Sequence, residues 1–303
     1  MSTVDALKQR LQELKKERRA IVLAHYYQRD EIQDVADYIG DSFGLSQQAA
    51  ATDAEVIVFC GVHFMAESAA ILSPEKIVLL PEPRAGCPMA DMIDIGGLRA
   101  FKAQHPGAAI VSYVNTSAAV KAESDICCTS SNAVKVVNSL DTDKVIFTPD
   151  RNLGRYVAQH TDKEIIVWEG YCHTHDHLTL EQFERIKAEH PGAPTVVHPE
   201  CRPEVSAAAD HVSSTAGILK FVRESDATEF IIGTEGGILH VMQQQNPGKK
   251  FYLASPDLIC PNMKANTLEK TVHALEVMQP RITVPEDIRN KAVRALDRML
   301  AIK

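Results

Sequence analysis

The chain repeats one pattern of residues three times, at a step of about 86 residues, which is too long for a solenoid unit and matches a small domain. Cysteines mark the repeat most clearly, because Cys87, Cys172 and Cys260 lie at steps of 85 and 88 residues. Two polar positions of the pattern recur at steps of 88 and 85 residues. The first is filled by His25, Tyr113 and His198, and the second by Ser42, Ser130 and Thr215. Three related copies of one domain are therefore expected.

Each copy contains continuous apolar runs, which are typical of parallel strands covered by helices on both faces. In each copy the first run is followed by two more. These later runs occupy residues 56–59 and 77–80 in the first copy, 145–147 and 165–168 in the second, and 230–232 and 251–254 in the third. The segments between them are long enough for helical crossovers. The predicted fold class is α/β, with three homologous Rossmann-like doubly wound domains around a pseudo-threefold axis.

The repeat also sets the predicted domain boundaries. The domains are an N-terminal helix with the first copy at 1–107, the second copy at 108–193, the third at 194–280, and a C-terminal helix at 281–303 that packs back on the first domain. Two helices are expected after the last cysteine, at 266–278 and 285–302, with Pro285 as the first residue of the second.

Charge and composition narrow the classes of function. A net charge of −8 and a pI near 5.8 leave no basic footprint for nucleic acid. The sequence has no run of about 18 apolar residues that could span a membrane. The polar N-terminus, with Leu7, Leu11 and Leu14 at helical spacing, predicts a surface helix and not a signal peptide. We therefore expect a cytoplasmic protein without nucleic-acid or membrane partners, whose seven cysteines are not in disulfides.

The repeated cysteines follow predicted strands, at the sheet edge where doubly wound folds bind ligands. A single cysteine is usually an inert buried side chain, but thiolates brought together select zinc, copper(I) or iron–sulfur centres. Equivalent positions in three copies predict one shared metal site made by Cys87, Cys172 and Cys260. The other cysteines break the repeat and are expected to be packing residues, namely Cys60, Cys127, Cys128 and Cys201.

Three cysteines suit a four-iron cluster that keeps one iron without a protein ligand, because such a cluster normally takes four. An open position of this kind makes a metal site catalytic. Zinc is the alternative, since alternation in an extended segment would put His173, His175 and His177 on one face, where one could supply a fourth ligand. No histidine follows Cys87 or Cys260 at the positions that match these histidines, and this favours an iron–sulfur cluster over zinc.

Polar residues on the strand ends and turns predict a substrate site beside the metal. Ser and Thr before the predicted helices 44–51, 132–138 and 216–224 are ordinary N-caps when taken singly. Three helix N-termini at one axis would instead attract a substrate with carboxylates or a phosphate. Strand-end residues face the same volume, namely His25, Tyr27, Tyr113, Asn115, His198 and Glu200. Tyr27, His175 and Glu200 can exchange protons, as a dehydration or an enolisation requires.

Taken together, the ordered motifs resemble the quinolinate synthase family across residues 20–280. The motifs are His25-Tyr-Tyr27-Gln28, Gly40-Asp-Ser42, Tyr113-Val-Asn115, Cys128-Thr-Ser130-Ser-Asn132, Gly170-Tyr-Cys172-His-Thr-His175, His198-Pro-Glu200, Ser214-Thr215 and Ile259-Cys260-Pro-Asn-Met263. The resemblance implies three Rossmann-like domains around one 4Fe-4S cluster per chain, held by the three repeated cysteines.

The resemblance also implies a reaction and a set of site residues. Iminosuccinate (iminoaspartate) and dihydroxyacetone phosphate would condense to quinolinate with loss of phosphate and water, a transferase step of de novo NAD biosynthesis. It also implies transient contact with the enzyme that produces iminosuccinate. The implied substrate-binding residues are His25, Ser42, Tyr113, Val114, Asn115, Ser130, His198, Pro199, Glu200 and Thr215. Tyr27, His175 and Glu200 would carry the acid–base chemistry, with the open iron assisting loss of a hydroxyl.

One departure from the family and two other functional classes bear on this interpretation. Some members carry a C-x-x-C-x-x-C run at the third cysteine, whereas here Cys260 is followed by Pro261-Asn-Met263, so a redox switch through such a run is not expected. A zinc-dependent hydrolase would use a zinc site in place of the cluster. A non-enzymatic iron–sulfur redox sensor would not need the strand-end His, Tyr and Glu residues.

Overall fold

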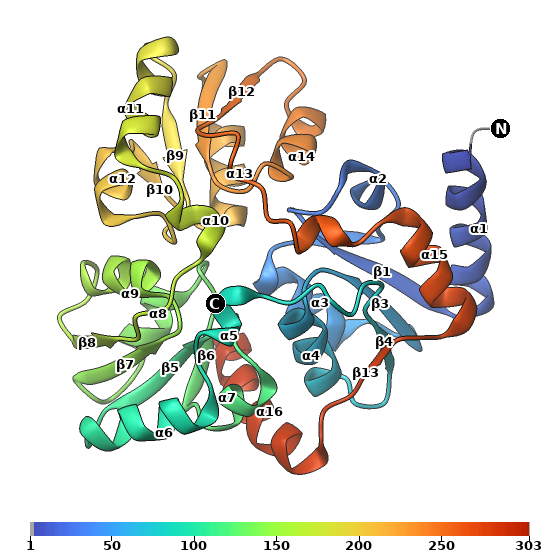
Figure 1. Cartoon of the computed structure of the whole chain (residues 1–303), viewed down its shortest axis with the longest axis horizontal. Coiled ribbons are helices and arrows are strands. Elements are labelled where there is room, and N and C mark those ends of the chain that lie inside the picture. Colours follow the sequence, from blue (N-terminus) through green and yellow to red (C-terminus); the bar gives the residue numbers. More distant parts are fainter. Residues whose placement is uncertain (1–2, 303) are drawn as a thin grey trace.

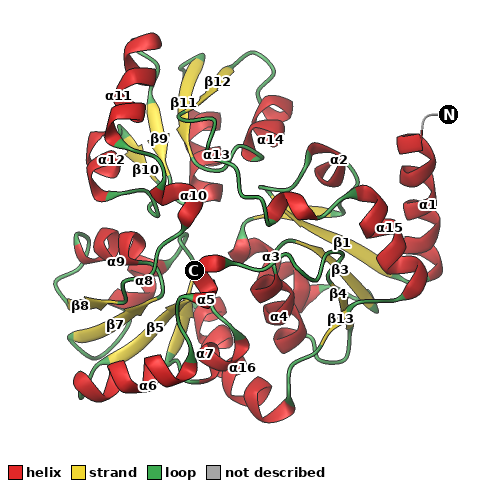
Figure 2. Cartoon of the chain, viewed as in Figure 1, coloured by secondary structure: helices red, strands yellow, loops and turns green. Residues whose placement is uncertain are grey.

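The computed structural model describes residues 3–302 and places three lobes around a common centre (Figure 1). Each lobe is one sheet with helices on both faces (Figure 2). All strand pairs are parallel except the pairing of β13 with β4. This confirms the predicted α/β class with doubly wound lobes.

The first lobe contains both the N-terminal helix and a helix from near the end of the chain. Its strands are β1 (Ala20–His25), β2 (Tyr38–Gly40), β3 (Val56–Cys60), β4 (Ile77–Leu79) and β13 (Arg281–Ile282). Its helices are α1 (Thr3–Glu17), α2 (Asp30–Gln33), α3 (Ser42–Ala51), α4 (His63–Leu72) and α15 (Leu268–Val277).

The other two lobes follow the same plan of alternating strands and helices. The second comprises α6 (Ile95–Gln104), β5 (Ala109–Tyr113), α7 (Ala118–Ala122), β6 (Ile126–Cys128), α8 (Ala133–Asn138), β7 (Lys144–Thr148), α9 (Arg151–Ala158) and β8 (Glu164–Val167). The third comprises α11 (Leu180–Glu189), β9 (Thr195–Val197), α12 (Pro203–Ala208), β10 (His211–Val212), α13 (Thr215–Glu224), β11 (Glu229–Gly233), α14 (Ile238–Gln245) and β12 (Lys250–Leu253). Short helical turns link the lobes: α5 (Pro88–Asp91), α10 (His173–Asp176) and η1 (Met263–Ala265).

The strand order is the same in all three lobes. It reads β2-β1-β3-β4, β6-β5-β7-β8 and β10-β9-β11-β12, so the first strand of each copy lies between its second and third. The second strand of each lobe was not predicted. These strands are only two or three residues long, too short for their apolar pattern to stand out from the turn that follows.

Apolar strands build a core that continues from lobe to lobe. Every residue of β3 is buried, as expected for a parallel strand covered on both faces. One group of contacting buried side chains includes Leu23 of the first lobe, Val111 of the second and Phe230 of the third. The lobes are therefore packed against one another, and their strand ends meet at a fixed place.

Packing moves the lobe boundaries to the cysteine-bearing turns. Leu98 of α6 is buried against Ile110 of the second lobe, although it precedes the predicted boundary at 107. Phe183 of α11 is likewise buried against Val197 of the third lobe. The helix that precedes the first strand of a copy thus covers the sheet of that copy, and the segments that carry the cysteines cross between lobes.

The end of the chain departs from the prediction in three respects. Helix α15, predicted to belong to the third domain, packs on α1 and β3 of the first lobe. Helix α16 (Glu286–Ala301), predicted to pack on the first domain, contacts α4 there but lies chiefly against α7 and β6 of the second lobe. Pro285 is the N-cap of α16 and not its first helical residue, because its backbone is still extended, with ψ at 139°.

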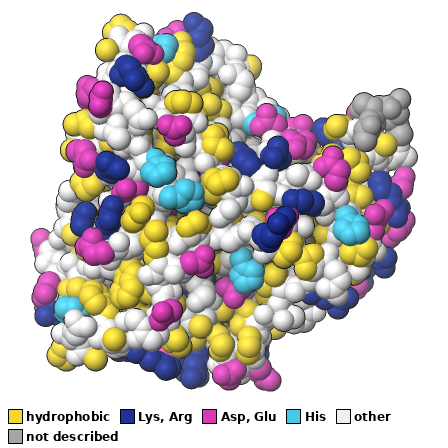
Figure 3. All heavy atoms as spheres, in the orientation of Figure 1, with side chains coloured by type: hydrophobic (Ala, Val, Ile, Leu, Met, Phe, Trp, Pro, Cys, Tyr) yellow, Lys and Arg dark blue, Asp and Glu magenta, His cyan; other side chains and the backbone are white. Residues whose placement is uncertain are grey.

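Charged side chains of both signs are interspersed on the face of the molecule shown in Figure 3. Among residues 3–302, no helix combines the length and the apolar character that a bilayer span requires.

Candidate active site

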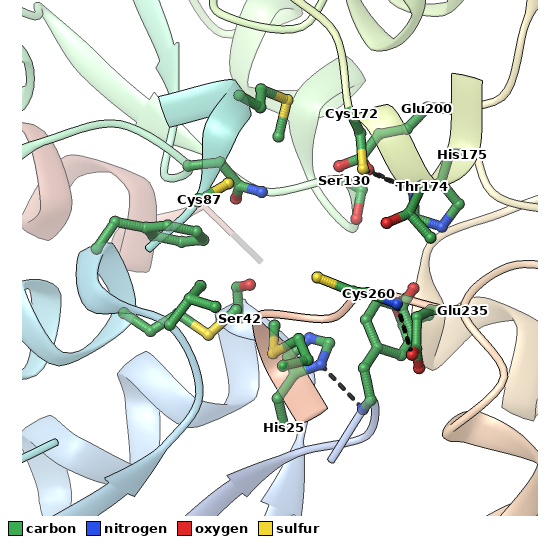
Figure 4. A pocket seen from close by; sticks show the side chains of 18 of the residues that line it. His25, Ser42, Cys87, Ser130, Cys172, Thr174, His175, Glu200, Glu235 and Cys260 are labelled. Carbon is green, nitrogen blue, oxygen red and sulfur yellow. Dashed lines mark hydrogen bonds and ion pairs between the residues drawn. The ribbon is translucent and has the colours of Figure 1, made fainter. Parts of the chain in front are cut away.

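The three lobes enclose one cavity where the carboxyl ends of their sheets converge. It holds about 700 Å³ of space, part of it open to solvent, and residues from all three copies line it. Figure 4 shows the three repeated cysteines around this space together with Ser42, Ser130, His175 and Glu200. Nearly all of the predicted site residues line it: His25, Tyr27, Ser42, Cys87, Tyr113, Asn115, Ser130, Cys172, His175, His198, Glu200, Thr215 and Cys260.

Two residues implied by the resemblance do not line the cavity. Val114 is buried, and its backbone N–H donates to the carbonyl of Cys128 at 2.9 Å, which holds the end of the second sheet. Pro199 lies between His198 and Glu200 but contributes no lining side chain. Val114 and Pro199 would affect a ligand only by positioning the neighbouring residues that line the cavity.

The three cysteines reach the cavity from the turns that link the lobes. Cys87 and Cys172 are the N-caps of α5 and α10, and Cys260 stands just before η1. Backbone N–H groups of these turns act against burial by lowering the pKa of all three thiols. Burial raises the pKa of each thiol, to about 12 for Cys87. Without a metal ion the thiols are therefore protonated, while the N–H donors favour thiolates once a metal binds.

A second possible set of metal ligands shares one of these cysteines. Ligand atoms of Cys172, His175 and Glu200 all lie within 4.8 Å of one another. The prediction that His173, His175 and His177 share one face of an extended segment is wrong, because that segment is helix α10. His175 therefore turns into the site, while His177, two residues further on, is exposed.

A chain of hydrogen bonds joins the three predicted acid–base residues. His175 Nδ1 donates to Glu200 Oε2 at 2.7 Å, because a carboxylate can only accept. His175 Nε2 lies 2.9 Å from the Thr234 hydroxyl, which is 2.6 Å from the Tyr27 phenol oxygen. The same phenol oxygen lies 2.8 Å from Thr215 Oγ1. A neutral imidazole that donates through Nδ1 accepts through Nε2, so the chain can run from Tyr27 through Thr234 to His175.

The surroundings of this chain keep Glu200 ionised and Tyr27 protonated. Burial alone would raise the pKa of the Glu200 carboxyl, but hydrogen bonds from His175 and Tyr113 outweigh burial and lower the pKa. Burial raises the pKa of the Tyr27 phenol well above its usual range. The site thus pairs a buried carboxylate with a buried proton donor, as acid–base catalysis requires.

The two repeat-equivalent histidines are held in the same way. The N–H of Tyr27 donates to His25 Nδ1 at 3.2 Å, and the N–H of Glu200 donates to His198 Nδ1 at 3.3 Å. Burial lowers the pKa of each imidazole to about 3, so both rings are neutral. A neutral ring that accepts at Nδ1 carries its proton on Nε2, and His198 presents this N–H to Ser130 Oγ at 3.2 Å.

The hydroxyl-rich turns connect the lobes as well as facing the cavity. Ser131 donates to Asp41 Oδ2 at 2.6 Å, between the second and first lobes. The cap of α3 is Asp41 and the cap of α13 is Ser214. The predicted residues Ser42 and Thr215 are the first residues of these helices, and their neighbours make the cap hydrogen bonds. The N-cap interpretation thus fails for the residues predicted to bind substrate.

Some lining residues were not predicted. Among the described residues that line the cavity none is Lys or Arg, so an anion would have to bind through neutral donors and helix N-termini. Apolar side chains beside the cysteines make the surroundings dry: Val62, Phe64, Met65, Met89 and Met263. Thr234 and Glu235 follow β11, and only Glu235 reaches the cavity.

A close backbone contact fixes Tyr27, and Gly237→Ala tests it. A Cβ at Gly237 would lie 2.8 Å from the Tyr27 Cα and 2.5 Å from Lys264 Nζ, so the backbone of Tyr27 would have to move. We expect the variant to lose roughly 1–3 kcal/mol in the free energy of unfolding by urea. Gly248→Ala is the control, because no atom lies within 4 Å of its Cβ. Equal stability of the two variants would contradict the contact.

The fold and this cavity define a class of protein: a three-lobed α/β protein whose central site combines thiols with buried histidines and a glutamate. The family model described as quinolinate synthetase A protein matches residues 9–301. A quinolinate synthase of Geobacter metallireducens is 60% identical over 298 residues, 98% of either chain. Quinolinate synthase 1 of Methanosarcina acetivorans is 57% identical over 303 residues, 100% of this chain and 99% of its own. The chain belongs to the quinolinate synthetase A family.

Proposed function

We propose that the protein condenses iminosuccinate with dihydroxyacetone phosphate and releases quinolinate, phosphate and water, in de novo NAD biosynthesis. The observation that carries this proposal is that Cys87, Cys172 and Cys260 meet at one cavity with the hydrogen-bonded chain from Glu200 to Tyr27. Family membership and the names of the relatives support it. The substrates and products balance without an oxidant, so the site needs dehydration and proton transfer but no electron acceptor.

The donor set fits one 4Fe-4S cluster. The three thiols come from separate turns, backbone N–H groups of the turns favour the thiolate forms, and apolar side chains line the same cavity. Sulfur hydrogen bonds and low solvent exposure are the features by which proteins tune such clusters. When bound, the cluster would supply an iron without a protein ligand, a Lewis acid for loss of a substrate hydroxyl.

The remaining residues would bind and orient the substrates. Ser42 and Thr215 begin α3 and α13, where backbone N–H groups can receive a carboxylate or a phosphate. Asn115 Oδ1 is buried and has no hydrogen-bond partner among the described residues. A donor group on a bound substrate would satisfy this acceptor, which would otherwise cost free energy.

Protons would move along the chain that ends at Tyr27. The Tyr27 phenol would give its proton to a leaving hydroxyl, while His175 takes a proton from the substrate carbon and Glu200 stabilises the imidazolium that forms. His175 would then return a proton to Tyr27 through the Thr234 hydroxyl. The two substrates carry hydroxyl, ketone and imine groups, whose condensation requires such transfers.

Zinc remains the alternative, and one observation favours it. Cys172, His175 and Glu200 are of the types and at the separation that a zinc ion takes, and such a site would suit a hydrolase. The alternative uses one thiol and leaves Cys87 and Cys260 unexplained. Metal content therefore separates the two proposals.

Anaerobic protein should contain about four irons and four sulfides per chain, as the cluster type requires, and little zinc. The same sample should form quinolinate from iminosuccinate and dihydroxyacetone phosphate, and omission of either substrate should abolish the product. Stoichiometric zinc without sulfide, in protein never exposed to air, would overturn the proposal in favour of the zinc site.

A further inference from the structure

The same backbone hydrogen bond anchors all three cysteine-bearing turns. In each turn, the carbonyl two residues before the cysteine accepts a backbone N–H. The bonds run from His63 to Ala85 at 2.8 Å, from Arg151 to Gly170 at 2.7 Å and from Gly236 to Leu258 at 2.8 Å. Each donor directly follows a residue that lies two positions after the end of a strand. These residues are Val62 after β3, Asp150 after β7 and Glu235 after β11.

In the second copy this position holds a fully buried carboxyl, Asp150. Its Oδ2 accepts the N–H of Cys172 at 2.9 Å, and its Oδ1 accepts the N–H of Leu153 at 2.7 Å. Both oxygens are thus used as acceptors. One side chain therefore ties the cysteine to the first turn of α9.

The third copy has the same arrangement with a longer side chain. Glu235 is also fully buried, and its Oε1 accepts the N–H of Cys260 at 3.0 Å. Its Oε2 accepts the N–H of Gly237 at 2.7 Å, and Lys264 Nζ lies 3.0 Å from Oε1. Figure 4 shows Glu235 beside Cys260 at the edge of the cavity. Lys264 also donates to the carbonyl of Tyr27, so Glu235 ties the cysteine to the first lobe.

The first copy differs, because Val62 occupies the position and offers no acceptor. Val62 stands 25 residues before Cys87, the same separation as Glu235 from Cys260. Its turn is held instead by the turn that carries Cys260, since Asn262 Nδ2 donates to the carbonyl of Gly86 at 2.9 Å. The backbones of Cys172 and Cys260 are thus fixed by carboxyls and that of Cys87 is not.

We propose that Asp150 and Glu235 are positioning residues that hold Cys172 and Cys260 ready to bind the metal centre. Burying a carboxyl is costly unless every oxygen finds a donor, and here the cysteine N–H is one of those donors. The inference rests on the proposed function, because it concerns the ligands of the iron–sulfur cluster. Groups that orient metal ligands in this way typically contribute 10- to 100-fold in metal affinity.

Amide variants test the role of the two carboxyls. Asp150→Asn and Glu235→Gln keep the shape of the side chain but replace one acceptor oxygen by an NH₂ group. The NH₂ group cannot accept a hydrogen bond, so one backbone N–H loses its acceptor. We expect each anaerobic variant to release iron to a chelator roughly 10-fold faster than the wild type, with a changed electron paramagnetic resonance spectrum of the reduced cluster. Asp94→Asn is the matched control, because Asp94 caps α6 through the N–H of Gly97 at 2.7 Å in the same way. Asp94 is exposed and does not line the cavity.

The outcomes separate this inference from the proposed function. If the wild type holds the cluster but both variants release iron at its rate with an unchanged spectrum, the positioning role is wrong and the proposed function stands. If the wild type contains neither iron nor sulfide, the proposed function fails and the inference with it. Far-ultraviolet circular dichroism of the metal-free variants checks folding, and if one variant does not fold, iron release from the other decides.

Discussion

Replacing any one of Cys87, Cys172 and Cys260 by Ser is expected to abolish both the iron–sulfur content and quinolinate formation. The three sulfurs come from three separate turns around one cavity, so no neighbouring thiol can take the place of a missing one. A hydroxyl is a poor ligand for soft iron–sulfur centres, and three ligands are already one fewer than a four-iron cluster normally takes. Iron and sulfide analysis beside an anaerobic assay measures both losses.

Cysteines away from the cavity provide the controls for this prediction. Cys60 is buried beside the Thr271 hydroxyl, 3.6 Å away, and Cys201 is hydrogen-bonded to the carbonyl of Gly233 at 3.4 Å. A serine at either position can keep the hydrogen bond, so Cys60→Ser and Cys201→Ser should keep the cluster and the activity. A full complement of iron and sulfide in Cys87→Ser or Cys260→Ser, with the loss confined to Cys172→Ser, would instead favour the site of Cys172, His175 and Glu200.

The repeat predicted the frame of the molecule because it is carried by long apolar strands and by residues at their ends. The runs at 56–59, 145–147 and 230–232 became β3, β7 and β11, with ends shifted by at most one residue. Packing between elements was harder to predict. Helices α6, α11 and α15 are amphipathic and could cover either neighbouring sheet, and only the path of the chain through the cysteine turns decides which.

Most of the candidate site was predicted from positions that the three copies share, and the residues that were missed lie where the copies differ. Thr234 joins His175 to Tyr27, yet the equivalent positions in the other copies hold Pro149 and Gly61, so the repeat gave no signal. The position of Asp150 and Glu235 is likewise filled by Val62 in the first copy. Helix α10 was missed because four residues are too few to show a helical period.

Glu200→Gln is expected to lower turnover by roughly 100-fold or more while leaving iron content and ligand affinity nearly intact. Glutamine can keep the hydrogen bond from His175 Nδ1, which is 2.7 Å long, but it cannot balance the charge of an imidazolium. Thr234→Val should have a similar effect, because it removes the hydroxyl between His175 and Tyr27 and keeps the side-chain shape. Anaerobic assays of turnover and of dicarboxylate binding test both variants.

Ser130→Ala separates binding from proton transfer. Ser130 faces the cavity and contacts His198 Nε2 but takes no part in the chain from Glu200 to Tyr27. Its hydroxyl would donate to a substrate anion, and loss of such a bond costs roughly 1.5–3 kcal/mol of binding. Thr215→Ala should also weaken binding, with an added effect on turnover because Thr215 contacts the Tyr27 phenol. If Glu200→Gln instead loses binding and keeps full turnover at saturation, Glu200 orients the substrate and does not act by stabilising a protonated His175.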